Sequence, residues 1–307
     1  MSQAVDGRFV QGLVSGLLAA LIWAAFPVVT KFTLESQSSL SAYDITALRF
    51  AVAGLILLPF LIKHFPKKVL LGPFALMVAG AGAPYVLVVA AGLNYAPAGH
   101  FGIITPSTML VCSTLISWKV FNEKLSMPQV MGVTTILTGI TLIGWQSLSL
   151  SSSNSLLGDA LFFIGGILWA TFTLTSKAAG IPPLQSTAIV AVLSMVLYLP
   201  FYIVFKEPAL LLQFPKETLL QGTYQGVFSA VIALLLYSKA VTILGASKGA
   251  LFGAVVPGTA LLLAIPTLGE IPTLIEILGV CLVMGGMLLA LGLFQYKIKA
   301  LRHRPID

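Results

Sequence analysis

Ten long apolar runs, each close to the length of a helix that crosses a bilayer, dominate this sequence of 307 residues. A helix needs about 20 apolar residues to span the hydrocarbon core. Only 9% of the residues are charged and the mean hydropathy is +1.00, whereas a soluble domain usually carries about 25% charged residues. The sequence therefore predicts an all-α integral membrane protein with ten transmembrane helices, near residues 11–33, 43–62, 70–92, 99–119, 128–147, 156–177, 184–205, 218–240, 247–268 and 273–295.

Residues recur at identical spacing in the two halves of the chain. The recurring residues are Trp23, Phe26 and Lys31, which match Trp169, Phe172 and Lys177, and Glu123, Gly132 and Gly139, which match Glu270, Gly279 and Gly286. Five spans per half is an odd number, so the two copies cross the membrane in opposite directions. Such inverted repeats are typical of secondary transporters. We expect two inverted five-helix repeats over 11–147 and 156–294, a Ser-rich linker over 148–155 and a basic cytoplasmic tail over 295–307.

The distribution of Lys and Arg indicates the orientation, because positively charged loops stay in the cytoplasm. With the N-terminus inside, 13 of the 17 basic residues lie on the cytoplasmic side, and the outer side keeps Lys31, Arg49, Lys206 and Lys216. The opposite orientation would reverse this ratio. We therefore expect both termini to be cytoplasmic and Ser151 to be periplasmic, in a multi-pass protein of the cell inner membrane.

Several cues together carry a resemblance to a known family. They are Trp23 and Trp169 in the first helix of each half, Arg49-Phe50 in the second helix, Pro106 and Pro257 inside the fourth and ninth helices, and the pattern Glu-x8-Gly-x6-Gly in both halves. With its ten spans and short loops, the chain resembles the EamA-type permeases of the drug/metabolite transporter superfamily over about residues 11–294. The resemblance implies an exporter of amino acids, metabolites or drugs.

Two prolines, Pro106 and Pro257, lie in the middle of corresponding spans. A proline inside a helix removes one backbone hydrogen bond and clashes with the preceding turn. We expect this pair to kink the helices around a central cavity and to flex during transport; a static bend is the alternative. Pro84 in the third span is assigned to the same pathway, although no proline matches it in the other half.

Aromatic side chains supply the other candidate pathway residues. Trp23 and Phe26 lie three residues apart and hence on one helix face, as do Trp169 and Phe172. Such a face lines a cavity, where aromatic rings attract a substrate cation, or it packs against helices and lipid. The remaining candidates are Tyr85, Phe101 and Tyr237. A buried tyrosine hydroxyl needs a partner, which is either the substrate or a helix backbone.

The predicted spans carry no acidic residue at mid-membrane depth. Asp159 and Glu276 lie near the ends of their spans, and His100 lies near the outer end of its span, where we expect an interfacial position. Because embedded carboxylates usually mediate proton exchange, we expect the substrate to move down its own gradient or to be weakly coupled. Lys31 and Lys177 are expected to snorkel to the interface or to contact a substrate carboxylate.

A secondary transporter is the leading interpretation. We expect it to export amino acids or related small metabolites by alternating access through a central cavity between the repeats. A broad-specificity drug or organic-cation exporter and a receptor-like relative that does not transport are the alternatives. An enzyme is not expected, because His64, His100 and His303 are scattered and form no catalytic cluster.

The expected partners follow from the same composition. They are a small-molecule substrate and the lipid bilayer, and a homo-oligomer is left open. We expect no catalytic residues, metal site or cofactor. Nucleic acid is not expected either, because the basic residues behind the net charge of +7 lie mostly in short loops between apolar runs.

Overall fold

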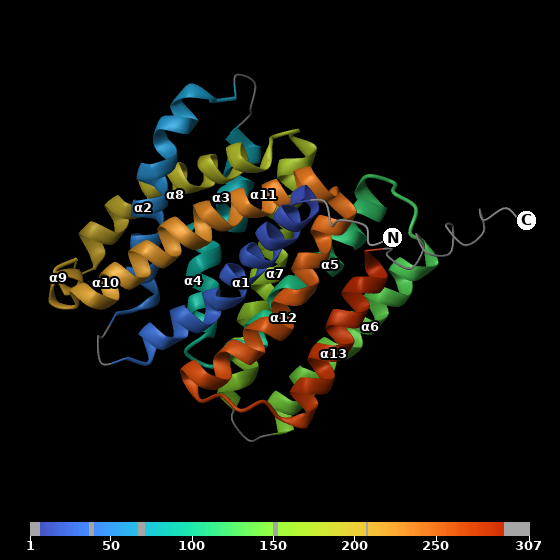
Figure 1. Ribbon diagram of the computed structural model, residues 1–307. Helices are drawn as coiled ribbons and strands as arrows, with labels where there is room; N and C mark the ends of the chain where they lie inside the picture. Colours follow the sequence, from blue (N-terminus) through green and yellow to red (C-terminus); the bar gives the residue numbers. More distant parts are fainter. Residues whose placement is uncertain (1–6, 37–39, 67–70, 150–152, 207, 292–307) are drawn as a thin grey trace, which may run out of the picture.

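The computed structural model describes residues 7–36, 40–66, 71–149, 153–206 and 208–291, and every regular element within these ranges is helical (Figure 1). The first half contains α1 (Gly7–Leu34), α2 (Ala42–Lys63), α3 (Leu71–Ala81), α4 (Ala83–Gly92), α5 (Ala98–Val120) and α6 (Met127–Ser149). The second half contains α7 (Ser153–Ala178), α8 (Pro183–Phe205), α9 (Leu210–Gln213), α10 (Pro215–Gln221), the π-helix η1 (Gly222–Ile232), α11 (Ala233–Leu244), α12 (Ala246–Leu268) and α13 (Leu274–Ala290).

Within the described ranges, nine helical segments are long and apolar enough to cross a membrane. Two of them are composite: α3 and α4 together form Leu71–Gly92, and α10, η1 and α11 form Pro215–Leu244. The tenth segment, α13, has 17 described residues. The expected all-α membrane protein with ten spans, five in each half, is therefore confirmed. Ser151 and the tail over 295–307 lie outside the described residues.

The third spanning segment of each half departs from a regular α-helix. The chain is extended at Gly82, and Pro84 lies in the first turn of α4, where a proline without an N–H is tolerated. The N–H of Ala83 at this break donates to Ser194 Oγ of α8 over 3.3 Å, which satisfies a backbone group that lipid could not. The other half contains η1 at this place. Irregular helices at membrane depth commonly mark binding sites.

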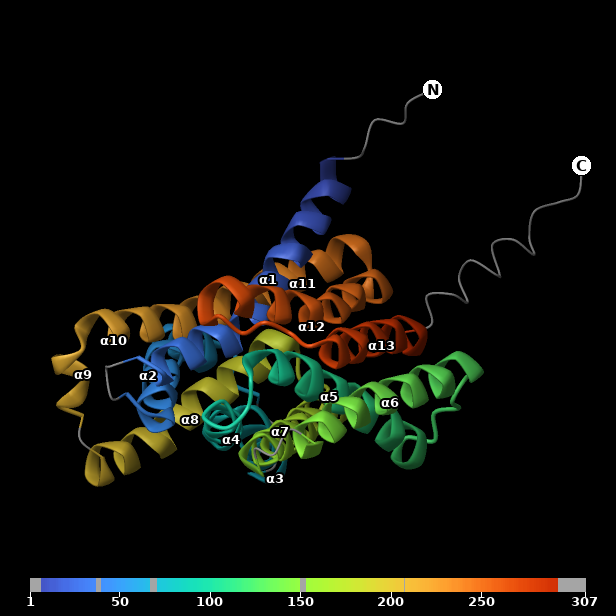
Figure 2. The same ribbon diagram turned by 90° about the horizontal axis from the view of Figure 1, so that it is seen from below.

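Equivalent helices of the two halves pack against each other: α2 on α8, α5 on α12 and α6 on α13. The first helix of each half also packs on the other half. Helix α1 contacts α11 and α12 of the second half, and α7 makes the equivalent contacts with α3, α4 and α5 of the first half. Figures 1 and 2 show α6 and α13 side by side at the edge of the molecule. This pattern is expected for two repeats related by a two-fold axis, and it places their interface at the centre of the bundle.

Glycines hold α6 and α13 at close range. A Cβ atom on Gly132 would lie 2.6 Å from the carbonyl oxygen of Gly286, and one on Gly139 would lie 2.9 Å from that of Gly279. Small residues permit this approach of two helix backbones in a membrane. The first glycine of the repeated pattern in one half therefore packs on the second glycine of the pattern in the other half.

We expect Gly286→Ala to lower the stability of the folded protein by about 1–3 kcal/mol, because overpacking a tight contact forces the backbones apart. The new methyl group would lie 2.8 Å from the carbonyl oxygen of Gly132. Gly285→Ala is the matched control, since nothing lies within 4 Å of its Cβ position and alanine favours helix more than glycine does. Thermal unfolding in detergent measures both variants, and equal midpoints would contradict the close packing of α6 on α13.

Candidate functional site

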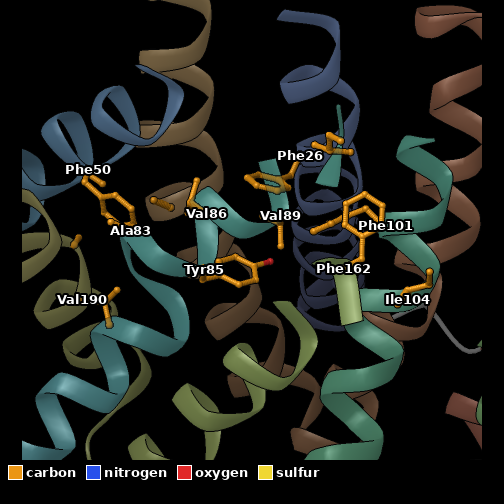
Figure 3. Close-up of a cluster of buried hydrophobic side chains, with 14 of the residues drawn as sticks. Phe26, Phe50, Ala83, Tyr85, Val86, Val89, Phe101, Ile104, Phe162 and Val190 are labelled. Atoms are coloured by element: carbon orange, nitrogen blue, oxygen red, sulfur yellow. The ribbon is translucent and has the colours of Figure 1, made fainter. Parts of the chain in front are cut away.

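Aromatic side chains from both halves meet in the interior of the bundle. The ring centroids of Phe26 on α1 and Phe101 on α5 are 5.4 Å apart, and Phe101 also contacts Phe162 on α7 at 5.5 Å. Tyr85 on α4 packs edge-on against Trp169 on α7, with centroids 4.7 Å apart. Figure 3 shows Phe26, Tyr85 and Phe101 directed toward the same part of the interior. These predicted pathway residues therefore lie close together.

The two repeat-matched tryptophans occupy equivalent environments. Trp23 on α1 packs against Tyr237 on α11, with centroids 5.3 Å apart, just as Trp169 on α7 packs against Tyr85 on α4. Each tryptophan thus contacts a tyrosine of the third spanning segment in the opposite half. The Trp23 indole N–H also donates to the Ser229 carbonyl oxygen over 3.3 Å, which fixes the ring orientation. Phe172 lies against Trp169 at 6.2 Å.

The predicted pathway prolines take different positions. Pro257 is buried and Pro106 is half-buried, each inside a helix that continues past it. A Cβ atom on Gly102 would lie 3.6 Å from the Pro257 carbonyl oxygen, so α5 and α12 cross near this proline. Pro84 is exposed, and the structure does not bring it into the aromatic cluster.

A polar cluster around Arg49 lies next to these aromatic rings. The Arg49 Nη1 group donates to Gln225 Oε1 over 2.8 Å and to Ser229 Oγ over 3.2 Å, and Gln225 Nε2 donates to Thr30 Oγ1 over 2.8 Å. The guanidinium carbon lies 5.5 Å from the centroid of Phe26. Arg49 is only 8% exposed and lies within α2, in the second helix where the sequence predicted it.

A second polar cluster joins α5, α7 and α13. His100 Nδ1 lies 2.8 Å from Asp159 Oδ1, and His100 Nε2 lies 2.7 Å from Glu276 Oε1. Ser147 Oγ donates to Asp159 over 2.5 Å, and the Thr273 N–H donates to Glu276 over 2.6 Å. His100 lies in the first turn of α5, near the helix end as expected, but it is only 3% exposed and is enclosed by protein side chains. A neutral imidazole has a single N–H, so both short contacts become hydrogen bonds only when the cluster binds one further proton.

Two Lys–Glu ion pairs lie at opposite ends of the bundle. Lys31 Nζ is 2.7 Å from Glu270 Oε1, and Lys177 Nζ is 2.7 Å from Glu123 Oε1. In each pair the lysine ends the first helix of one half and the glutamate precedes the last helix of the other half. Lys31 is therefore bound by a carboxylate of the protein. The two expected roles, snorkelling to the interface and contact with a substrate carboxylate, did not include this ion pair.

The two pairs differ in burial. The Lys31 side chain is 11% exposed, whereas the Lys177 side chain is 55% exposed. Lys31 also donates to the Ala96 carbonyl oxygen over 3.0 Å, and Glu270 accepts from the Ala98 N–H over 2.9 Å. The Lys31 end of the bundle is thus closed more tightly than the Lys177 end.

Comparison with known proteins now decides the family. The EamA-like transporter family matches residues 10–145 and 156–292. The chain belongs to this family. As an EamA-like transporter with apolar helices of membrane-spanning length, it is a multi-pass membrane protein whose family membership implies small-molecule substrates.

Relatives of this EamA-like transporter are named as uncharacterized transporters. The uncharacterized transporter YetK of Bacillus subtilis is 26% identical over 255 residues, which cover 79% of this chain and 76% of YetK. The uncharacterized inner membrane transporter YicL of Salmonella typhimurium is 25% identical over 302 residues, which cover 91% and 94% of the two chains. A solved crystal structure superposes with a TM-score of 0.61 at 17% identity, covering 94% of this chain and 99% of the other, and thus shares the fold.

Proposed function

We propose that this EamA-like transporter is a secondary transporter of the cell inner membrane that exports amino acids or related small metabolites by alternating access. The moving units are the two repeats, over 11–147 and 156–294, and the pathway runs between them past the aromatic cluster. We place both termini and the Lys177 end on the cytoplasmic side, as the distribution of basic residues favours.

The observation that carries this proposal is the symmetry of the two Lys–Glu pairs. Both pairs join one repeat to the other, and they do so at opposite ends of the bundle. Separating Lys31 from Glu270 would loosen one end, and separating Lys177 from Glu123 would loosen the other. Alternating access requires that one end opens while the other is closed. Equivalent ion pairs at the two ends can hold each end closed in turn.

The alternative is a broad drug or organic-cation exporter. The aromatic faces of Trp23 and Trp169 favour it, because such faces attract cations in a water-poor site. A transport panel that includes a radiolabelled amino-acid mixture and the cation tetraphenylphosphonium separates the two candidates.

Cross-linking the ends tests the proposed alternation. The two native cysteines, Cys112 and Cys281, are free and are first replaced by serine. We then expect that joining Lys31→Cys to Glu270→Cys, or Lys177→Cys to Glu123→Cys, with a short reducible bifunctional thiol reagent abolishes exchange of the amino-acid mixture in proteoliposomes. Reduction should restore it.

Single-cysteine variants treated with the same reagent are the control for modification without cross-linking. Transport that continues at the full rate with either end quantitatively cross-linked would refute alternating access in which these two ion pairs separate in turn.

A further inference from the structure

We infer that Arg49 binds the anionic group of the transported solute, and that this solute is a small carboxylate with an apolar or aromatic body. The inference rests on the proposed transport function and adds to it the chemical class of the substrate. It also favours the amino-acid and metabolite interpretation over the organic-cation alternative.

Arg49 lacks a counter-charge among the described residues. Arg49 lies seven residues after the first residue of α2, roughly 10 Å along the helix at 1.5 Å per residue. Of the three buried basic side chains in the described ranges, Lys31 and His100 face carboxylates, whereas Arg49 forms no ion pair there. Asp44, five residues earlier in α2, instead accepts from Tyr202 Oη over 2.5 Å. An unpaired charge at this depth is costly and marks a site that an anion would stabilise.

Arg49 also has N–H donors that the described residues leave unbound. A guanidinium group carries five N–H donors in a planar fork. Two belong to Nη1, which is bound by Gln225 and Ser229. The Nε and Nη2 groups make no hydrogen bond with the described part of the chain. These two groups on one edge are the pair that binds a carboxylate through two parallel hydrogen bonds.

The polar cluster holds that edge in place. Gln225 is itself fixed by Thr30, and both Gln225 and Ser229 lie on the buried face of η1. The guanidinium group is therefore oriented by neutral partners that satisfy one side of it without neutralising its charge. A site prepared in this way loses little conformational freedom when the anion binds.

An aromatic side chain lies next to the guanidinium group of Arg49. The Phe26 ring lies against the guanidinium group and belongs to the aromatic cluster with Phe101. The side chain of Tyr85 is buried, and its hydroxyl has no hydrogen-bond partner among the described residues. Figure 3 shows this hydroxyl directed into the interior, toward the region between Phe26 and Phe162. The site thus offers a cation, one further donor and apolar walls, which suit a carboxylate on an apolar body.

The test compares acids with their amides. Phenylalanine, leucine and lactate are each paired with phenylalaninamide, leucinamide and lactamide, so that only the carboxylate is removed. Binding to the purified protein is followed by tryptophan fluorescence, and uptake is measured in proteoliposomes. We expect at least one acid to bind and to be transported, and its amide to bind at least about tenfold more weakly, as the loss of a charge-assisted hydrogen bond implies.

Substitution of the arginine sharpens the comparison. Arg49→Gln should weaken binding of the acid about tenfold to a hundredfold and leave binding of the amide unchanged, and Arg49→Lys should have an intermediate effect. Lys239→Gln removes the same charge from an exposed position and should change neither. If Arg49→Gln does not fold, the ratio of acid to amide affinity in the unaltered protein still decides the question.

The outcomes separate the inference from the proposed function. Equal affinity for acid and amide, or an acid preference that survives Arg49→Gln, would overturn the inference. Transport of tetraphenylphosphonium without any of the acids would also overturn it, while leaving the protein a transporter. Transport of neither the acids nor the cation would count against the proposed function itself, and the inference would fall with it.

Discussion

Replacement of His100 by alanine is expected to destabilise the folded protein by about 3–5 kcal/mol, the usual cost of removing one partner from a buried charge cluster. The imidazole ring lies between Asp159 and Glu276, with both contacts shorter than 3 Å and all three side chains buried. Without the ring, the two carboxylates keep only neutral partners, Ser147 and Thr273, and must either take up protons or repel each other.

Thermal unfolding in detergent measures this effect, with His64→Ala as the matched control. The exposed His64 stacks on Phe60, and surface changes usually alter stability by less than about 0.5 kcal/mol. Adding Asp159→Asn to His100→Ala should recover part of the loss, since it removes one of the two stranded charges. An unchanged unfolding temperature for His100→Ala would show that the cluster does not hold α5, α7 and α13 together.

The second large effect is expected at Lys31. Lys31→Ala should cost about 2–4 kcal/mol, because it strands Glu270 at a partly buried position. Lys177→Ala should cost less than about 1 kcal/mol, since the pair with Glu123 is exposed to solvent and its attraction is screened. The two lysines are repeat-matched and make ion pairs of equal length, so the difference comes from the burial of the Lys31 pair and from its additional hydrogen bonds to the Ala96 carbonyl oxygen and from the Ala98 N–H.

Double-mutant cycles measure both couplings. Combining Lys31→Ala with Glu270→Gln, and Lys177→Ala with Glu123→Gln, gives the interaction free energy of each pair. A coupling at least as large for the pair at Lys177 as for the pair at Lys31 would mean that the Lys31 end is not the more tightly closed one.

Run length and spacing were enough to predict the helices and the repeat. Both are local properties of the chain, so ten apolar runs and two copies of the Glu-x8-Gly-x6-Gly pattern could be read without knowing any tertiary contact. The break between α3 and α4 also has a local signal, Gly82 followed by Pro84, although the length of the apolar run predicts a single helix near 70–92. The widening of η1 has no comparable signal in its residues.

The contacts between distant segments could not be predicted in this way. Hydropathy gives the depth of a residue along one helix but not the residue that faces it from another helix. Asp159 and Glu276 each looked like an isolated acid near a helix end, and only the fold brings them to the two sides of His100, 59 and 176 residues away. The expectation that transport is not coupled to protons through a mid-span carboxylate stays a prediction.

The polar residues that face Arg49 and α1 have a weak signal in the sequence, which the sequence-based predictions did not include. Gln221, Gln225 and Ser229 follow one another at four-residue intervals in an apolar span, a spacing that places them on one helix face. A polar stripe of this kind at membrane depth needs a partner inside the protein. The partners are residues of α1 and Arg49 of α2. They could not be predicted, because only the fold shows that the third spanning segment of the second half packs against α1 and α2.

The glycine contacts between α6 and α13 restrict how the two repeats can rearrange. Backbone atoms meet there without intervening side chains, so neither helix can slide along the other without its next larger residue, such as Ile136 or Ile143, meeting the opposing backbone. The contact between α5 and α12 is different, because the Leu261 side chain fills the space beside Gly99. A motion that opened one end would therefore turn about the α6–α13 edge, and the largest displacements would fall on the helices at the opposite side of the molecule, α2, α8, α9 and α10 (Figure 1).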